Sequence, residues 1–132
     1  MVVDTSALIA ILDREPDAAL YAEAIAEADA PLISAATLLE LHIVMLNRRG
    51  AAAAQIVDQL VKDAGFQIEN FTAQYLELAR EAYARYGKGR NTAGLNYGDC
   101  FSYALAKATG LPLLFKGEDF SKTDLPAALA DI

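Results

Sequence analysis

Four acidic residues stand where the surrounding sequence predicts burial or the end of a strand. Asp4 closes the strand-like segment MVVD, Glu40 interrupts the apolar run TLLELHIVML, Asp99 precedes the apolar helix pattern CFSYALAKATG, and Asp119 follows the apolar segment PLLF by four residues. A carboxylate that loses its water is destabilising unless a partner compensates it. Glu40 has no Lys or Arg three or four residues away, so its partner must come from elsewhere in the chain.

Gathered in one crevice, these acids would repel one another strongly. Two unit charges ~4 Å apart repel by about 4 kcal/mol at an effective dielectric constant near 20. A Mg²⁺ or Mn²⁺ ion removes this cost, because both ions prefer carboxylate and water oxygens in octahedral geometry. Such an ion can activate a water and stabilise the charge that develops on a phosphoryl group. The pattern therefore indicates a metal-dependent hydrolase of phosphate esters, in which hydroxyl or amide groups of Thr5, Ser6 and Asn96 could orient the water.

Several of these residues also have ordinary structural explanations. Asp99 could serve only as a helix cap, since acidic residues suit the positive end of the helix dipole. Capping or local turn bonding explains Thr5, Ser6 and Asn96 equally well, and Glu40 could reach solvent through a gap. His42 is interpreted as a packing or surface residue, because a single His without a second ligand is a weak metal signal.

Short apolar segments that alternate with helical patterns must position the four acids. Strands are expected at residues 1–4, 31–34, 66–70 and 112–115, and helices at 7–12, 15–29, 35–49, 51–65, 72–86 and 96–110. The expected caps include Thr5-Ser6, Ser34 and Thr72, with Pro16 in the first turn of its helix and Gly65 and Gly110 as stops. This alternation predicts one α/β domain over 1–132, a three-layer sandwich with a short, mostly parallel sheet flanked by helices.

In such folds the ligand crevice lies outside the carboxyl ends of the strands. If the strands are parallel, Asp4 and Asp119 share one edge of the sheet, and Glu40 falls near that edge. Asp99 can join them only if its helix starts at the same edge. A helix that leads back to a parallel strand does so.

The composition limits the other possibilities. The 132 residues carry a net charge of −7, which excludes nucleic-acid binding through a broad basic face. The cations that could contact a phosphate, each interpreted as a surface charge, are Arg48, Arg49, Lys88, Arg90 and Lys116. A single cysteine, Cys100, favours a reducing compartment, and no apolar stretch reaches about 18 residues. We therefore expect a cytoplasmic protein without a membrane span.

The motifs together resemble a known family. The segments VVDTSAL and LNYGDCFSYALAKATGLPLLFKGEDF, with the TD pair that follows, resemble the PIN-domain ribonucleases, specifically the VapC toxins of toxin–antitoxin modules, over the whole chain. The resemblance implies an acidic quartet of Asp4, Glu40, Asp99 and Asp119, with Asp4 and Asp99 as metal ligands. It leaves open whether Glu118, Asp119 or Asp124 completes the site, and if Asp124 does not, it is expected as a supporting residue beside the metal ligands.

By the same resemblance, the expected activity is Mg²⁺- or Mn²⁺-dependent endonucleolytic cleavage of a structured RNA, often tRNA. The expected partners are the RNA substrate, a second copy in a homodimer, and a cognate VapB-type antitoxin that inhibits the enzyme.

Two other function classes compete with this interpretation. A phosphatase of the haloacid-dehalogenase type also uses an aspartate after its first strand, but its chemistry needs a second Asp two positions later, where this chain has Ser6. A non-catalytic protein-interaction domain could use the acids to attract a basic partner, but it does not explain an acid on an otherwise apolar helix.

Overall fold

Four short parallel strands form the centre of the structure, a computed structural model that describes residues 1–129. The strands are β1 (Val2–Val3), β2 (Leu32–Ser34), β3 (Gln67–Glu69) and β4 (Leu113–Leu114), and they lie in the order β3-β2-β1-β4. Every pairing between neighbouring strands is parallel. The predicted α/β sandwich with a short parallel sheet is confirmed.

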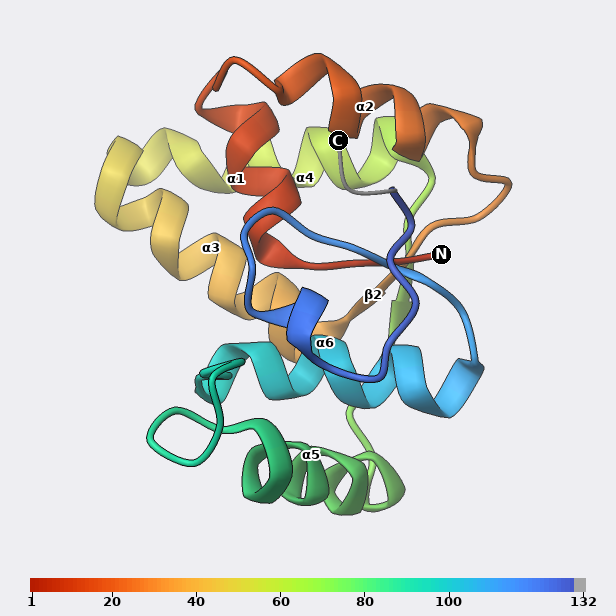
Figure 1. Ribbon diagram of the computed structural model, residues 1–132. Coiled ribbons are helices and arrows are strands. Elements are labelled where there is room, and N and C mark those ends of the chain that lie inside the picture. The colour runs from red at the N-terminus through yellow and green to blue at the C-terminus, as the bar shows by residue number, and fades with distance from the viewer. Residues whose placement is uncertain (130–132) are drawn as a thin grey trace.

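Helices cover both faces of this sheet (Figure 1). In chain order they are α1 (Thr5–Leu12), α2 (Ala18–Glu27), α3 (Ala35–Arg49), the 3₁₀ turn η1 (Gly50–Ala52), α4 (Ala53–Ala64), α5 (Ala73–Tyr86), α6 (Tyr97–Thr109) and the 3₁₀ turn η2 (Phe120–Lys122). Figure 1 shows α1, α2 and α4 on one side of the strands and α6 on the other, with α5 packed outside α6. Within residues 1–129, no helix combines the length and apolar content that a membrane span requires.

The two residues of β1 pack in two separate hydrophobic cores, because successive side chains of a strand point to opposite faces of the sheet. Val3 packs in the core that α1 to α4 share, with Leu8 and Leu41 among its members. Val2 packs in the opposite core, with Leu105 of α6 and Phe120 of η2. Both valines are fully buried. The sheet is therefore the middle of three layers.

The strand order places the crevice beside β1. The chain proceeds from β1 through β2 to β3 in one direction and then returns to β4 on the far side of β1. The helices that lead away from β1 and those that lead back to β4 therefore lie on opposite faces. In open parallel sheets the crevice forms where the winding direction reverses. Here that point lies between the carboxyl ends of β1 and β4, next to Asp4.

Several predicted helix boundaries need correction. The cap of α1 is Asp4 and not Thr5-Ser6, since its side chain accepts a hydrogen bond from the backbone N–H of Ser6 and the helix begins at Thr5. Pro16 precedes α2 and is not in its first turn, because the chain turns sharply at Arg14, whose φ is 52°. The predicted 51–65 helix consists of η1 followed by α4.

The other predicted caps and stops are confirmed. The side chains of Ser34 and Thr72 accept the capping hydrogen bonds of α3 and α5. Gly65 and Gly110 follow α4 and α6 with φ of 69° and 71°, a left-handed conformation that glycine adopts without a steric penalty.

Candidate active site

Asp4 is the most buried of the four acids, with 3% of its surface exposed. Its Oδ2 accepts hydrogen bonds from the backbone N–H of Ser6 at 3.0 Å and from the Ser6 hydroxyl at 2.7 Å. Its Oδ1 accepts a third hydrogen bond, from the hydroxyl of Ser102 on α6, at 2.5 Å. These three donors fix the Asp4 carboxylate in one orientation at the end of β1.

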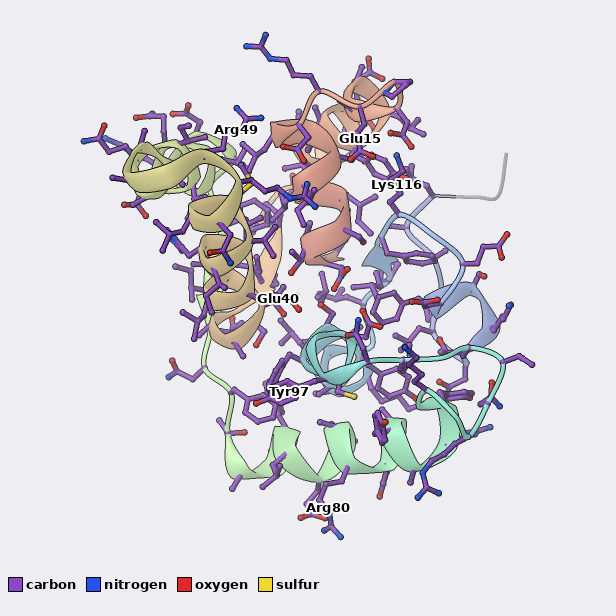
Figure 2. The ribbon with its side chains drawn as sticks, turned by 90° about the vertical axis from the view of Figure 1, so that its left-hand side faces the viewer. Glu15, Glu40, Arg49, Arg80, Tyr97 and Lys116 are labelled. Carbon is purple, nitrogen blue, oxygen red and sulfur yellow. The ribbon has the colours of Figure 1, made fainter. Side chains whose placement is uncertain are left out.

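Glu40 lies in the second turn of α3, half-buried, and points toward the first turn of α6 (Figure 2). The Thr5 hydroxyl donates a hydrogen bond to its Oε1 at 2.6 Å, and the carboxylate touches the Cα side of Gly98. Burial raises the pKa of Glu40, the Thr5 hydrogen bond opposes that rise, and the charge of Asp4 adds to it. The partner from elsewhere in the chain is therefore the Thr5 hydroxyl, and no ion pair to Glu40 occurs among residues 1–129.

Asp99 is the third residue of α6 and takes part in a reciprocal cap with Asn96. Asn96 Oδ1 accepts the backbone N–H of Asp99, and Asp99 Oδ2 accepts the backbone N–H of Asn96, both at 2.9 Å. Asn96 is thus the cap residue, and Asp99 supports it from one oxygen only. The two sequence interpretations of Asp99, cap or site residue, are therefore compatible.

The other three acids influence the pKa of Asp99. The pKa of Asp99 is raised to about 7: burial is the largest cause, a hydrogen bond from Asn96 opposes the rise, and the charges of Asp4, Asp119 and Glu40 add to it. These three acids come from β1, α3 and the segment after β4. The charges of all three therefore act on Asp99, in agreement with the expected position of the four acids at one edge of the sheet.

Of the three candidates in the segment after β4, Asp119 is the one whose charge acts on Asp99. Glu118 is exposed and carries no such influence. Asp124, expected as a supporting residue, lies elsewhere: it binds Lys107, in the last turn of α6, at 2.7 Å and the Tyr103 hydroxyl at 2.6 Å.

Desolvation raises the pKa of Asp124, but the hydrogen bonds from Lys107 and Tyr103 outweigh it, and the pKa lies below its ordinary value. Lys107 and Asp99 are separated by eight residues of α6, or roughly 12 Å along the helix axis. Asp124 therefore holds the C-terminal segment against the far end of α6 and is not part of the acidic cluster.

Ser6 joins the two strands that border the crevice. Its hydroxyl donates to Asp4 and accepts the backbone N–H of Lys116, which follows β4, at 3.0 Å. The Lys116 ammonium binds Glu15 at 2.7 Å and Asp17 at 3.0 Å, so its charge is already paired (Figure 2). Arg48 and Arg49, two more candidate phosphate contacts, also have paired charges, because both form ion pairs with Asp13.

Three residues at the site were missed by the sequence analysis: Thr37, Gly98 and Ser102. The signal for Ser102 was present, because residues three apart share a helix face and Ser102 stands three after Asp99. Thr37 precedes Glu40 by the same interval. Nothing local marked Gly98, since its role depends on an acid from another helix.

The acidic cluster suits a hydrated hard cation. Residues 1–129 contain no group of three or more His, Cys, Asp or Glu side chains placed so that together they could hold a metal ion. Mg²⁺ does not require one, because it keeps several waters and binds through one or two carboxylates. Asp4 and Asp99 offer carboxylate oxygens, which fits Mg²⁺ or Mn²⁺. The thiol of the neighbouring Cys100 donates to the Asn96 carbonyl, and its pKa is raised to about 11, chiefly by burial, so it does not supply the thiolate that Zn²⁺ prefers.

Comparison with known proteins assigns the family. Residues 1–125 match the PIN domain. The chain is 51% identical, over 127 residues, to Ribonuclease VapC of Mycolicibacterium smegmatis, in a match that spans 96% of this chain and 98% of that relative. The chain belongs to the VapC branch of the PIN-domain family. The resemblance seen in the motifs is confirmed.

Solved structures share the fold of this PIN domain at low sequence identity. The crystal structure of Mycobacterium tuberculosis VapC20, described as a sarcin–ricin loop cleaving toxin, matches with a TM-score of 0.76 at 21% identity, over 94% of this chain and 95% of that one. A toxin–antitoxin complex from Klebsiella pneumoniae matches with a TM-score of 0.69 at 19% identity, over 93% of this chain and 92% of that one.

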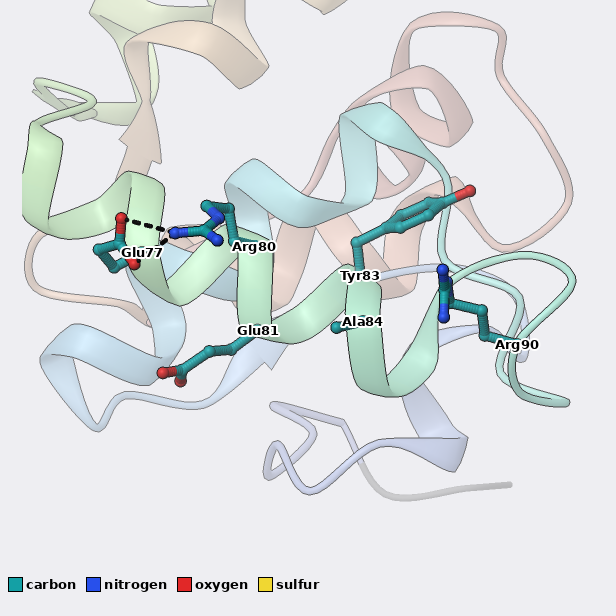
Figure 3. Close-up of a pocket in the computed structure, with 6 residues that line it drawn as sticks. All are labelled: Glu77, Arg80, Glu81, Tyr83, Ala84 and Arg90. Carbon is teal, nitrogen blue, oxygen red and sulfur yellow. Dashed lines mark hydrogen bonds and ion pairs between the residues drawn. The ribbon is translucent and has the colours of Figure 1, made fainter.

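A surface hollow beside α5 of this PIN domain is not a rival site. It encloses about 550 Å³, and its lining comprises Glu77, Arg80, Glu81, Tyr83, Ala84 and Arg90 (Figure 3). Arg80 already binds Glu77 at 2.9 Å, and none of the four clustered acids lines the hollow.

Proposed function

We propose that this chain is the toxin of a toxin–antitoxin pair, an endoribonuclease that cuts structured RNA with Mg²⁺ or Mn²⁺. The observation that supports the proposal is that the charges of Asp4, Asp119 and Glu40 all raise the pKa of Asp99, in a chain about half identical to a VapC ribonuclease. A cluster of mutually repelling acids lowers stability, which a protein tolerates when the cluster serves a cation and a reaction.

The surroundings of each acidic residue suggest its role in the proposed reaction. Asp4 and Asp99 would hold the cation, which when bound polarises a phosphate oxygen and acidifies a water. Glu40 would take up a proton from the attacking water, because burial raises its pKa and so makes its carboxylate a better proton acceptor. Asp119, exposed at the rim, would hold the water or a second hydrated ion. Thr5 and Ser6 fix Glu40 and Asp4 through hydrogen bonds, and Asn96 holds Asp99.

The two rival classes receive no support. The Ser6 hydroxyl donates to Asp4 at the position where a haloacid-dehalogenase-type phosphatase needs its second aspartate. An acidic interaction surface needs exposed charges, whereas Asp4 is buried and burial is the largest cause of the raised pKa of both Glu40 and Asp99.

We also propose a homodimer, formed through an apolar face beside the site. This α3–α6 apolar face consists of Leu39, Ile43, Val44, Tyr97 and Phe101, which line a groove of about 280 Å³ together with Glu40. Leu39 and Ile43 are 60% and 50% exposed, and Tyr97 is 75% exposed. Contiguous exposed apolar surface of this kind marks an interaction site in soluble proteins.

The proposed inhibitor is a cognate VapB-type antitoxin, and the proposed location is the cytoplasm. The likeness to a toxin–antitoxin complex in fold and the ~50% identity to VapC support an antitoxin partner. Among structured RNAs, tRNA is the substrate class that we propose to test first.

Cleavage assays on purified protein test the function. The substrates are total tRNA and hairpin RNA oligonucleotides, each with millimolar Mg²⁺ or Mn²⁺ and with EDTA. Asp4→Asn keeps the α1 cap, because Asn caps as well as Asp, and it should lose cleavage. Glu23→Gln, an exposed acid on α2, is the matched control and should cleave normally. Cleavage that persists in EDTA, or in Asp4→Asn, would contradict the proposed mechanism.

A further inference from the structure

Two buried hydroxyls connect three elements behind Asp4. Ser102 of α6 and Thr37 of α3 are 1% and 0% exposed. The Ser102 hydroxyl lies 2.5 Å from Asp4 Oδ1, and the Thr37 hydroxyl lies 3.3 Å from Ser102 Oγ. Thr37 stands one turn before Glu40 on α3, so this short chain of hydroxyls connects the helix of one acid to the carboxylate of another.

The direction of these hydrogen bonds follows from their chemistry. An ionised carboxylate only accepts hydrogen bonds, so the single hydroxyl hydrogen of Ser102 must be donated to Asp4. Ser102 Oγ can then only accept from Thr37, which makes Thr37 the donor. The order Thr37 to Ser102 to Asp4 is therefore determined, and each bond polarises the next in a low-dielectric interior.

Counting lone pairs shows which part of Asp4 remains available. Each carboxylate oxygen accepts about two hydrogen bonds. Oδ2 already accepts two, both from Ser6, whereas Oδ1 accepts one, from Ser102. One lone pair of Oδ1 is uncommitted, and its direction depends on where Ser102 holds the other.

A hydroxyl on a helix does not need a distant partner. Thr109, also on α6, donates to the carbonyl of Leu105 in its own helix at 2.8 Å, which is the usual local solution. Ser102 instead reaches a residue 98 positions away in sequence, and Thr37 reaches one 65 positions away. Ser102 stands far enough inside α6 to use the same local solution, but its hydroxyl donates to Asp4 instead.

We propose that Ser102 is a positioning residue for metal binding: it orients the free lone pair of Asp4 Oδ1, and Thr37 aligns Ser102. This rests on the proposed metal-dependent function. Groups that hold metal ligands in this way typically change metal affinity by ~10–100-fold when removed. Ser102 does not touch the cation or the RNA, so its effect passes through Asp4.

The test measures Mn²⁺ affinity in the absence of RNA, by electron paramagnetic resonance of free Mn²⁺, well below the melting temperature of each variant. Ser102→Ala should raise the Kd about tenfold and Thr37→Val by a smaller factor, roughly threefold. The double variant should be no weaker than Ser102→Ala alone, because both act on one bond. Thr37→Ser, which keeps the hydroxyl, should restore affinity.

Thr109→Ala removes a hydroxyl from the same helix and should leave the Kd unchanged. A folded Ser102→Ala protein that binds Mn²⁺ within about twofold of the wild type, against the ~10–100-fold expected, would overturn the proposal while leaving the proposed function intact. If Ser102→Ala does not fold, Thr37→Val against Thr37→Ser decides the matter by the same criterion. A wild-type protein that binds no Mn²⁺ would contradict the proposed function and this inference with it.

Discussion

The Cα of Gly98 lies directly against the carboxylate of Glu40. A Cβ at position 98 would stand 2.6 Å from Glu40 Cδ and would overlap the carboxylate oxygens. Gly98 is the second residue of α6, where unpaired backbone N–H groups and the helix dipole favour a negative charge. The absence of a side chain at position 98 is therefore what lets an acid from α3 approach Asp99.

The first prediction is that Gly98→Ala strongly reduces cleavage without unfolding the protein. The obstructed group is the end of a flexible side chain, so Glu40 moves aside and the backbone does not. Cleavage should fall about 10²-fold, the usual cost of a misplacement of about 1 Å. The free energy of unfolding should stay the same or rise by up to ~1 kcal/mol, because alanine is the better helix former. RNA cleavage and urea denaturation measure the two effects.

A shorter acid provides the control for Gly98→Ala. In the double variant Gly98→Ala, Glu40→Asp the carboxylate is withdrawn by one methylene, and part of the lost cleavage should return. Wild-type cleavage by Gly98→Ala alone would show that the contact between positions 40 and 98 has no role in the site.

The second prediction concerns Asp99→Asn and the pH dependence of stability. The folded pKa of Asp99, about 7, lies above its ordinary value of 3.8, so the folded state binds the proton more tightly than the unfolded state. Below about pH 4, Asp99 is protonated in both states and does not lower the free energy of unfolding. Between about pH 4 and pH 7 its ionisation lowers the free energy of unfolding progressively, and above about pH 7 the destabilisation is complete. An amide at this position does not titrate, so the Asp99→Asn variant carries no such penalty.

In EDTA, Asp99→Asn should equal the wild type near pH 4 and exceed it near pH 8 by about 1–2 kcal/mol, after allowance for screening at a partly exposed group. Urea denaturation across this range measures the difference. Cleavage by the variant should fall about 10²-fold or more, because an amide oxygen replaces an anionic ligand. A pH-independent difference, or a variant that cuts RNA at the wild-type rate, would show that Asp99 supports the cap and nothing else.

The third prediction is that divalent cations stabilise the wild-type protein. Mn²⁺ or Mg²⁺ at ~100 times its Kd should add about 2.7 kcal/mol to the free energy of unfolding. The cause is relief of the repulsion among the four acids. Thermal denaturation with and without metal tests this, with Asp4→Asn as the variant that should lose most of the response. No shift at millimolar metal would count against a shared cation site.

The fourth prediction addresses self-association. Ile43→Asp places a charge in the centre of the α3–α6 apolar face, where Ile43 is 50% exposed, and should convert a dimer to a monomer in sedimentation velocity. Gln55→Asp adds the same charge on the exposed surface of α4 and should leave the dimer intact. A wild-type protein that sediments as a monomer at micromolar concentration would refute the proposed dimer.

The fifth prediction concerns the antitoxin. A partner that inhibits should insert an Arg or Lys among Asp4, Glu40 and Asp99, because a guanidinium pairs bidentately with carboxylates and could displace the cation. Neutralising that residue on the partner should weaken inhibition of RNA cleavage and make it insensitive to the metal concentration. Inhibition that survives removal of every positive charge from the inserted segment would exclude this mechanism.

Local sequence was sufficient to predict the alternating strands and helices of this chain. Strand segments such as VV and LL are β-branched or apolar, and caps such as Ser34 and Thr72 act on backbone groups two or three residues away. The topology follows from chain order, since a parallel sheet with helical crossovers puts strand ends on one edge. Asp4 and Asp119 could be assigned to that edge because each directly follows a strand or its turn.

The contacts that hold the acids depended on tertiary packing. Ser102 reaches Asp4 and Gly98 admits Glu40 only because α6 packs against β1 and α3, and no short-range pattern encodes such a distance. Asp124 was misplaced for the converse reason. It lies five residues after Asp119, but the chain turns at η2 and carries it to Lys107 at the far end of α6. The residue types and their positions after the strands thus indicated the chemistry, and tertiary packing decided which of these side chains meet.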